Sequence, residues 1–93
     1  MHDLRLVREL YHDLDGDHYG RNLAQVTGMS LTATYTALRK LERLGWIAGR
    51  DEDIDPQTEG RQPRRLYHLT KNGIEQYHDI VRSITPTTGG LPA

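Results

Sequence analysis

The segment from Ser30 to Ile47, SLTATYTALRKLERLGWI, constrains the fold of this chain more than any other. Its periodicity predicts a helix that Ser30 caps and Gly45 ends, followed at once by a strand over residues 46–48. At 100° per residue, one side of this helix is predicted to be buried and contains Leu31, Thr34, Leu38, Leu41 and Gly45. The opposite side is short and polar at its start and cationic toward its end, with Thr32, Ala33, Thr36, Lys40 and Arg43.

A second segment, GRQPRRLYHLT from Gly60, carries a run of basic residues into another strand. Residues 66–69 predict the antiparallel partner of the strand at 46–48. Residues 51–63 contain Pro56, Gly60 and Pro63 without periodicity, which predicts a loop. The loop ends in a basic cluster that contains Arg61, Gln62, Arg64 and Arg65, and five acidic residues precede it. The arginines are therefore either free to meet an anion or paired with the acids nearby.

Further helices complete the domain. Asp3 can cap a first helix, a second opens at residue 17 or 18 and extends to about Thr27, and a last one follows Thr70. The fold class is therefore mainly α with a small β-hairpin (α+β), in the order α-α-α-β-wing-β-α, which is a winged helix-turn-helix. Residues 1–84 form one domain, and residues 85–93 form a flexible tail. Its parts are an N-terminal helix at 1–15, the helix-turn-helix at 18–45, the wing at 46–70 and a C-terminal helix at 71–84.

Charge is unevenly distributed along the chain. The formal net charge is −1, yet residues 21–50 and 61–71 together hold nine basic and one acidic side chain, a net charge of +8. A polyanion responds to the local potential of a face rather than to the sum over the molecule. The segregation therefore indicates a nucleic-acid-binding face on a nearly neutral protein.

These features predict binding to double-stranded DNA. A helix enters the major groove when the exposed side chains near its start are small, so contacts to bases are assigned to Thr32, Ala33 and Thr36. A basic arm places its cations on phosphates or in the minor groove, which supplies affinity more than sequence choice. The complete predicted DNA-binding set is Ser30, Thr32, Ala33, Tyr35, Thr36, Lys40, Arg43, Arg61, Gln62, Arg64 and Arg65.

The joint spacing of several short motifs resembles the PadR family of winged-helix transcriptional regulators. The matching motifs are Tyr19-Gly20, Leu23-Ala24, Ser30, YTALRKLE from Tyr35, Gly45-Trp46-Ile47, GRQPRRLY from Gly60, Leu69-Thr70 and Gly73. The resemblance implies a homodimeric repressor that binds a palindromic operator. Many members also sense a small molecule, so a small-molecule effector is a possible further partner. One departure is Thr34, which stands where the family usually has an apolar residue.

The family dimerises through its C-terminal helix, which is short in this chain. The first helix is therefore expected to share the interface. The predicted dimer-interface residues are Leu6, Leu10, Leu14, Tyr77, Ile80, Val81 and Ile84.

Two alternatives stay open. One is a winged helix used for protein contact, as an accessory subunit or anti-repressor, which the nearly neutral charge and the acidic half of the wing favour. The other is a ligand- or metal-responsive regulator, although the five histidines are too scattered to predict a metal site. No cofactor is predicted, and no catalytic motif supports an enzyme. The lack of cysteine and of any long apolar run predicts a cytoplasmic protein without membrane association.

Overall fold

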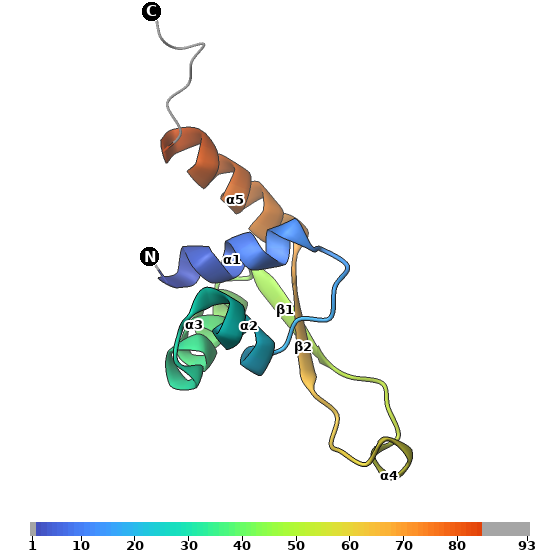
Figure 1. The fold of residues 1–93 in the computed structure, drawn as a ribbon. Helices are drawn as coiled ribbons and strands as arrows, with labels where there is room; N and C mark the ends of the chain where they lie inside the picture. Colours follow the sequence, from blue (N-terminus) through green and yellow to red (C-terminus); the bar gives the residue numbers. More distant parts are fainter. Residues whose placement is uncertain (1, 85–93) are drawn as a thin grey trace, which may run out of the picture.

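The computed structural model describes residues 2–84, and the predicted order of elements is confirmed (Figure 1). The prediction of a flexible tail at 85–93 lies outside the described residues. The elements are α1 His2–His12, α2 Gly20–Thr27, α3 Leu31–Arg43, β1 Ile47–Asp51, α4 Pro56–Glu59, β2 Arg65–Leu69 and α5 Lys71–Ile84. In the part of the chain that the structure describes, no helix is both long and apolar enough to cross a membrane.

Two helix boundaries differ from the prediction. α1 ends at His12 rather than at residue 15, because the amide of Gly16 donates to the carbonyl of Asp13 in a turn, 3.1 Å away. α2 begins only at Gly20, because the chain at His18 is held as an extended bridge to β2. There the amide of Tyr67 donates to the carbonyl oxygen of His18 at 2.8 Å. The connection between the first two helices is therefore tied to the hairpin.

The hairpin is longer than the sequence predicted. β1 and β2 pair antiparallel from Ile47 opposite Leu69 to Asp51 opposite Arg65, and Trp46 lies outside the strand. The residues between the strands, 52–64, form the wing. The expectation of a wing without secondary structure was wrong, because it contains α4.

α4 is a single turn between a strong start signal and a strong stop signal. The Asp55 carboxylate caps it by accepting from the amide of Gln57 at 3.1 Å and from the hydroxyl of Thr58 at 2.8 Å. Pro56 supplies the first helical position, and Gly60 ends the turn with a left-handed φ of 73°. Four residues are too few to produce a periodic pattern, so the sequence showed no helix here.

The core lies between α1, α2, α3 and the inner face of the hairpin. Its fully buried side chains are Leu6, Val7 and Leu10 of α1, Leu23 of α2, and Thr34, Leu38 and Leu41 of α3. Thr34 fits this apolar setting because its hydroxyl donates to the carbonyl of Ser30 at 2.8 Å. Leu31, predicted to be buried, is 42% exposed because it lies at the edge of the packed side.

α5 leaves the body at a hydrogen-bonded junction and projects away from α3 and the wing (Figure 1). The hydroxyl of Thr70 donates to the carbonyl of Gly45 at 2.6 Å, and it accepts from the amide of Gly73 at 3.0 Å. The amide of Thr70 donates to the carbonyl of Trp46 at 3.0 Å. This junction joins the end of α3, the start of β1 and the first turn of α5.

Candidate nucleic-acid interface

The exposed side of α3 is a continuous polar and cationic surface. The packed side is centred on Thr34, Ala37, Leu38 and Leu41. The opposite side is exposed, and the recognition face is defined here as Thr32, Tyr35, Thr36, Arg39 and Arg43. Two of these residues are short and three are long, so the face has a slim start and a cationic end.

Arg39 is the residue that the sequence analysis missed. Counting Leu31 and Gly45 as buried moved the expected outward direction toward Lys40. With the packed side that the structure shows, Arg39 lies within about 30° of the outward direction at 100° per residue. A helical wheel centred on Thr34 and Leu41 alone would have found it.

Three predicted members of the site are placed differently. Ala33 is half-buried and packs against the core rather than facing outward. The Ser30 hydroxyl is occupied as the cap of α3, where it accepts from the amide of Ala33 at 3.1 Å. The Lys40 ammonium lies 2.8 Å from the Asp3 carboxylate, so it joins α3 to α1.

Tyr35 connects the recognition face to the start of α2. Its phenol ring lies directly over Gly20, and a Cβ atom at that position would overlap the ring. Gly20 is therefore required for this close approach. Tyr35 stays 37% exposed while its ring covers the first residue of α2. The start of α2 and the recognition face thus form one surface.

Arg61 and Glu52 cross-link the wing near its base. Two guanidinium nitrogens of Arg61 donate to the two carboxylate oxygens of Glu52, at 2.7 and 3.1 Å. The backbone amide of Arg64 donates to Glu52 Oε1 at 3.2 Å. The Arg61 guanidinium and then the Arg64 amide hold the pKa of Glu52 at about 2, well below its usual value. The pairing of wing acids with wing arginines is therefore realised at Arg61.

We expect the wing to be sensitive to acid only at low pH. Because the pKa of Glu52 in the folded protein is lowered from 4.5 to about 2, its stabilisation of the wing is complete above about pH 4.5. That stabilisation is lost as the pH falls from 4.5 toward 2. A carboxyl-carbon NMR titration should show Glu52 titrating near pH 2, and Arg61→Gln should move the midpoint up toward 4.5. A Glu52 midpoint near 4.5 in the unmodified protein would contradict the bidentate pair.

The other two arginines of the predicted basic cluster have different surroundings. The guanidinium of Arg64 stacks on Tyr19, 4.3 Å from the ring centroid. Tyr19 directly precedes Gly20, the residue that the Tyr35 ring covers, so this stack holds Arg64 at the start of α2. Arg65 instead donates to the Glu42 carboxylate of α3 at 3.2 Å. Gln62, the remaining predicted wing residue, is exposed.

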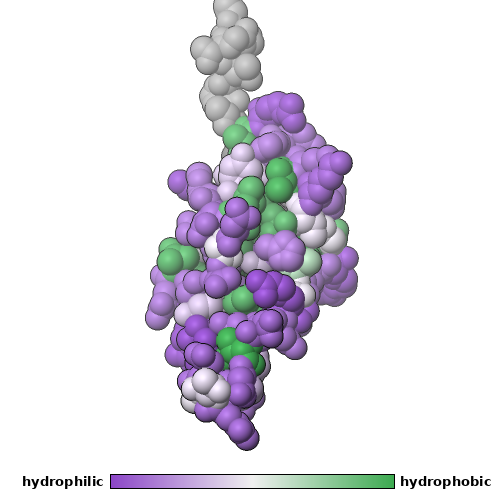
Figure 2. All heavy atoms as spheres, turned by 90° about the vertical axis from the view of Figure 1, so that its right-hand side faces the viewer, coloured by the Kyte–Doolittle hydropathy of each residue, from purple (hydrophilic) through white to green (hydrophobic). Residues whose placement is uncertain are grey.

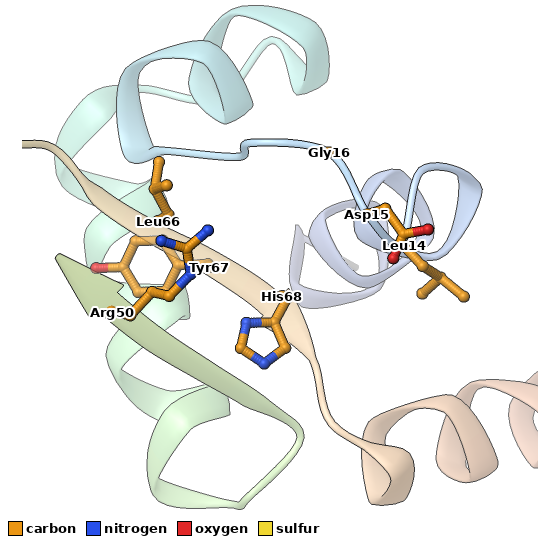
Figure 3. A pocket seen from close by; sticks show the side chains of 7 residues that line it. All are labelled: Leu14, Asp15, Gly16, Arg50, Leu66, Tyr67 and His68. Carbon is orange, nitrogen blue, oxygen red and sulfur yellow. The ribbon is translucent and has the colours of Figure 1, made fainter. Parts of the chain in front are cut away.

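A small open cleft lies between the α1–α2 connection and the hairpin (Figure 3). Its volume is about 230 Å³, and it is lined by Leu14, Asp15, Gly16, Arg50, Leu66, Tyr67 and His68. Typical ligand pockets are larger and mainly apolar, at about 300–1,000 Å³. Among the residues that the structure describes, no three His, Cys, Asp or Glu side chains are grouped to hold a metal ion.

The predicted dimer residues lie in different surroundings. Leu6 and Leu10 are completely buried in the core of the single chain, so assigning them to a dimer interface was wrong. Leu14 lies beyond the end of α1 and is 41% exposed. The ring of Tyr77 packs on that of Tyr11, with centroids 4.6 Å apart. Ile80 and Val81 are half-buried in the outer half of α5, and the side chain of Ile84 lies outside the described part.

The fold and the surface beside α3 define a winged-helix domain, with α2 and α3 as the helix-turn-helix and a hairpin with a long wing. No family model and no curated protein matches the chain. Solved structures of transcription regulators share its fold at low sequence identity.

A mutant of MepR from Staphylococcus aureus bound to an oligodeoxyribonucleotide matches 99% of this chain with a TM-score of 0.75 and 19% identity. This chain spans only 64% of that MepR chain. A PadR family transcription regulator from hypervirulent Clostridium difficile matches 87% of this chain and 83% of its own, with a TM-score of 0.72 and 22% identity. A transcriptional regulator homologue from Pyrococcus horikoshii matches 98% and 83%, with a TM-score of 0.76 and 19% identity. The predicted PadR-like winged-helix fold is confirmed.

Proposed function

We propose that this protein is a transcriptional regulator that binds double-stranded DNA sequence-specifically, with α3 in the major groove. The observation that carries the proposal is the recognition face, which is exposed along the whole of α3, together with Arg64 of the wing, which stacks on Tyr19 at the start of α2. The structure of MepR, which shares this fold, contains a bound oligodeoxyribonucleotide. Winged-helix geometry and a cationic exposed helix support the same function here.

Each part of the recognition face has a distinct proposed role. Thr32 and Thr36 are short enough to bring α3 close to base edges, where their methyl groups can contact thymine. The Thr36 hydroxyl donates to the carbonyl of Thr32 at 2.9 Å, so its oxygen can accept from a base. Arg39 and Arg43 reach phosphates on the two sides of the groove. Tyr35 reaches a phosphate from the α2 side.

The hairpin contributes mainly affinity in this proposal. Arg64 is placed to contact the phosphate backbone or the minor groove, because its stack on Tyr19 holds it at the start of α2, which Tyr35 of α3 covers. Arg61 and Lys40 are held in ion pairs with Glu52 and Asp3. An arginine or lysine in such a pair has to exchange one anion for another, so its gain from binding a phosphate is smaller.

We also propose that the protein is a homodimeric cytoplasmic repressor that binds a palindromic operator. α5 projects from the body with Ile80 and Val81 half-buried on it, and hydrophobic surface gathers at the level of α5 (Figure 2). A domain of this length buries a modest core, and association of α5 with a second copy would extend it. Repression would follow from occupying a promoter. A small-molecule effector stays a prediction.

Selection of bound duplexes from a random pool, followed by sequencing, tests this function directly. We expect an inverted repeat whose half-sites are about one helical turn, 10–10.5 base pairs, apart. Thr36→Val should change the preferred bases within each half-site, whereas Arg64→Ala should weaken all sequences by a similar factor. Identical effects of the two substitutions on every operator variant would contradict the assigned roles. Enrichment of a single unpaired half-site would contradict the homodimer.

A protein-contact function has one structural observation in its favour. Arg61, Arg65 and Lys40, which were predicted to bind DNA, all lie in ion pairs within the chain. Weak, salt-insensitive DNA binding together with co-purification of one defined protein partner would favour an accessory subunit or anti-repressor over a DNA-binding regulator.

A further inference from the structure

Arg65 joins three elements of the fold through its guanidinium group. Its NH2 nitrogen lies 3.2 Å from the Glu42 carboxylate on α3, and its NH1 nitrogen lies 3.6 Å from the Asp51 carboxylate on β1. Arg65 itself is the first residue of β2, directly opposite Asp51 in the strand register. A single side chain therefore spans from the hairpin to the last turn of α3.

Gly49 provides the space that this arrangement needs. The Arg65 guanidinium lies flat against it, and a Cβ atom at position 49 would lie 2.9–3.0 Å from Nε, Cζ and NH2 of Arg65. Glycine in the middle of a strand weakens the strand, and it often marks a place where another group approaches closely. At Gly49 that group is the guanidinium of Arg65.

Charge also favours this position of the Arg65 guanidinium. The hydrogen bond to Glu42 raises the pKa of Arg65 further. The side chain of Glu42 is 30% exposed and that of Arg65 is 47% exposed, so both are partly sheltered. Arg65 is thus less available to an outside anion than Arg64, the preceding residue, which has no carboxylate partner in an ion pair among the described residues.

We propose that Arg65 is a positioning residue that fixes the hairpin relative to the recognition helix, and that it is not a phosphate contact. Glu42 binds its guanidinium group, and Gly49 leaves the space for it. This inference rests on the proposed function, because what it positions is Arg64 relative to α3. If the hairpin turns relative to α3, Arg64 and the recognition face no longer reach the same duplex together. Turning the hairpin would therefore weaken binding to the operator, whereas binding to unrelated DNA sequences would change little.

Positioning and phosphate contact are separated by three substitutions, with Arg65→Gln as a fourth, and operator affinity is measured at several salt concentrations. Arg65→Lys keeps the charge, but an ammonium group lacks the planar set of donors with which the guanidinium bridges two carboxylates. Gly49→Ala keeps every charge and displaces the guanidinium. Glu42→Gln removes an acid that would repel DNA. We expect each to lower operator affinity roughly 10-fold, to lower binding to unrelated DNA much less, and to leave the salt slope unchanged.

If Arg65 instead contacts a phosphate, the same assays give different results. Arg65→Gln would then reduce the slope of log K against log salt by roughly 2 for a dimer, because one phosphate per protomer is lost. Arg65→Lys and Gly49→Ala would then bind nearly as the unmodified protein does, and Glu42→Gln would bind more tightly. Tighter binding by Glu42→Gln, or a reduced slope for Arg65→Gln, would overturn the positioning role. The matched control is Arg82→Lys, at an exposed ion pair on α5 with Asp79.

A measurement without DNA keeps this inference separate from the proposed function. The chain contains no cysteine, so spin labels attach only to cysteines that are introduced. Arg43→Cys supplies one on α3, and Gln62→Cys supplies one on the wing. The distance distribution between the labels should broaden with Arg65→Lys and with Gly49→Ala, in proteins that keep the helical content of the parent. An unchanged distribution would overturn the positioning role, whether or not the protein binds DNA. Failure of the parent protein to bind any duplex would instead overturn the proposed function.

Discussion

Raising the salt concentration from 50 to 200 mM is expected to weaken binding of this protein to its operator by about 10⁴-fold. In α3, the first turn of α2 and the wing, the exposed cations without a carboxylate partner among the described residues are Arg39, Arg43, Arg21 and Arg64. A dimer would then neutralise about eight phosphates, which gives a slope of log K against log salt of roughly −7. Arg61, Arg65 and Lys40 add little because their partners already compensate their charge.

The double variant Arg39→Ala/Arg43→Ala tests the source of this salt dependence. It removes four cations from a dimer, so the slope should fall to about half of its original value. The matched control is Arg82→Ala, which removes a cation from α5 at the opposite end of the molecule from α3 (Figure 1). Its slope should equal that of the parent. A binding isotherm that does not respond to salt would contradict the cationic interface.

Gly73→Ala is expected to destabilise the folded domain by about 3 kcal/mol, at the upper end of what overpacking usually costs. Gly73 is buried in the first turn of α5, and a Cβ atom there would overlap the backbone carbonyl oxygen of Trp46. That carbonyl accepts from the amide and the hydroxyl of Thr70, at 3.0 and 3.1 Å. It cannot move aside without breaking the junction that holds α5.

Thermal unfolding measures the change in stability caused by Gly73→Ala. Helix propensity alone predicts a change of the opposite sign. Ala is favoured over Gly by about 0.5–1 kcal/mol inside a helix, so propensity alone makes Gly73→Ala stabilising. For a domain of this size, the expected loss lowers Tm by roughly 10–25 °C. Glu75→Ala, at an exposed position of the same helix, should change stability by less than about 0.5 kcal/mol. A Gly73→Ala protein that melts at or above the parent temperature would show that the junction at Trp46 is not as close as described.

The elements of the fold were largely predictable because their signals are local. The start of α3 is marked by Ser30 as its cap and its end by Gly45, and Thr70 marks the start of α5. α4 was missed because one turn between Pro56 and Gly60 is too short for a period to be visible. The start of α2 was placed early because a contact with β2, distant in sequence, holds His18 in an extended bridge.

The candidate site was predictable in kind but not in detail. Clustered cations indicated an anion-binding face, and the cationic end of α3 followed from its periodicity. Which cations are available depends on their neighbours in space, and the partners of Arg61 and Arg65 lie 9 and 23 residues away in the sequence. Leu6 and Leu10 were assigned to a dimer interface because periodicity gives the apolar width of a helix but not which neighbour covers it.

The sequence by itself determined the order of helices and strands, the turn residues between them and the presence of an exposed cationic helix, because these follow from the spacing of neighbouring residues. Only the tertiary structure decided that Arg64 stacks on Tyr19 at the start of α2 while Arg65 is held by Glu42 over Gly49. The physical reason is that electrostatic and packing partners are chosen by distance in space, and the hairpin brings together residues that the chain order keeps far apart.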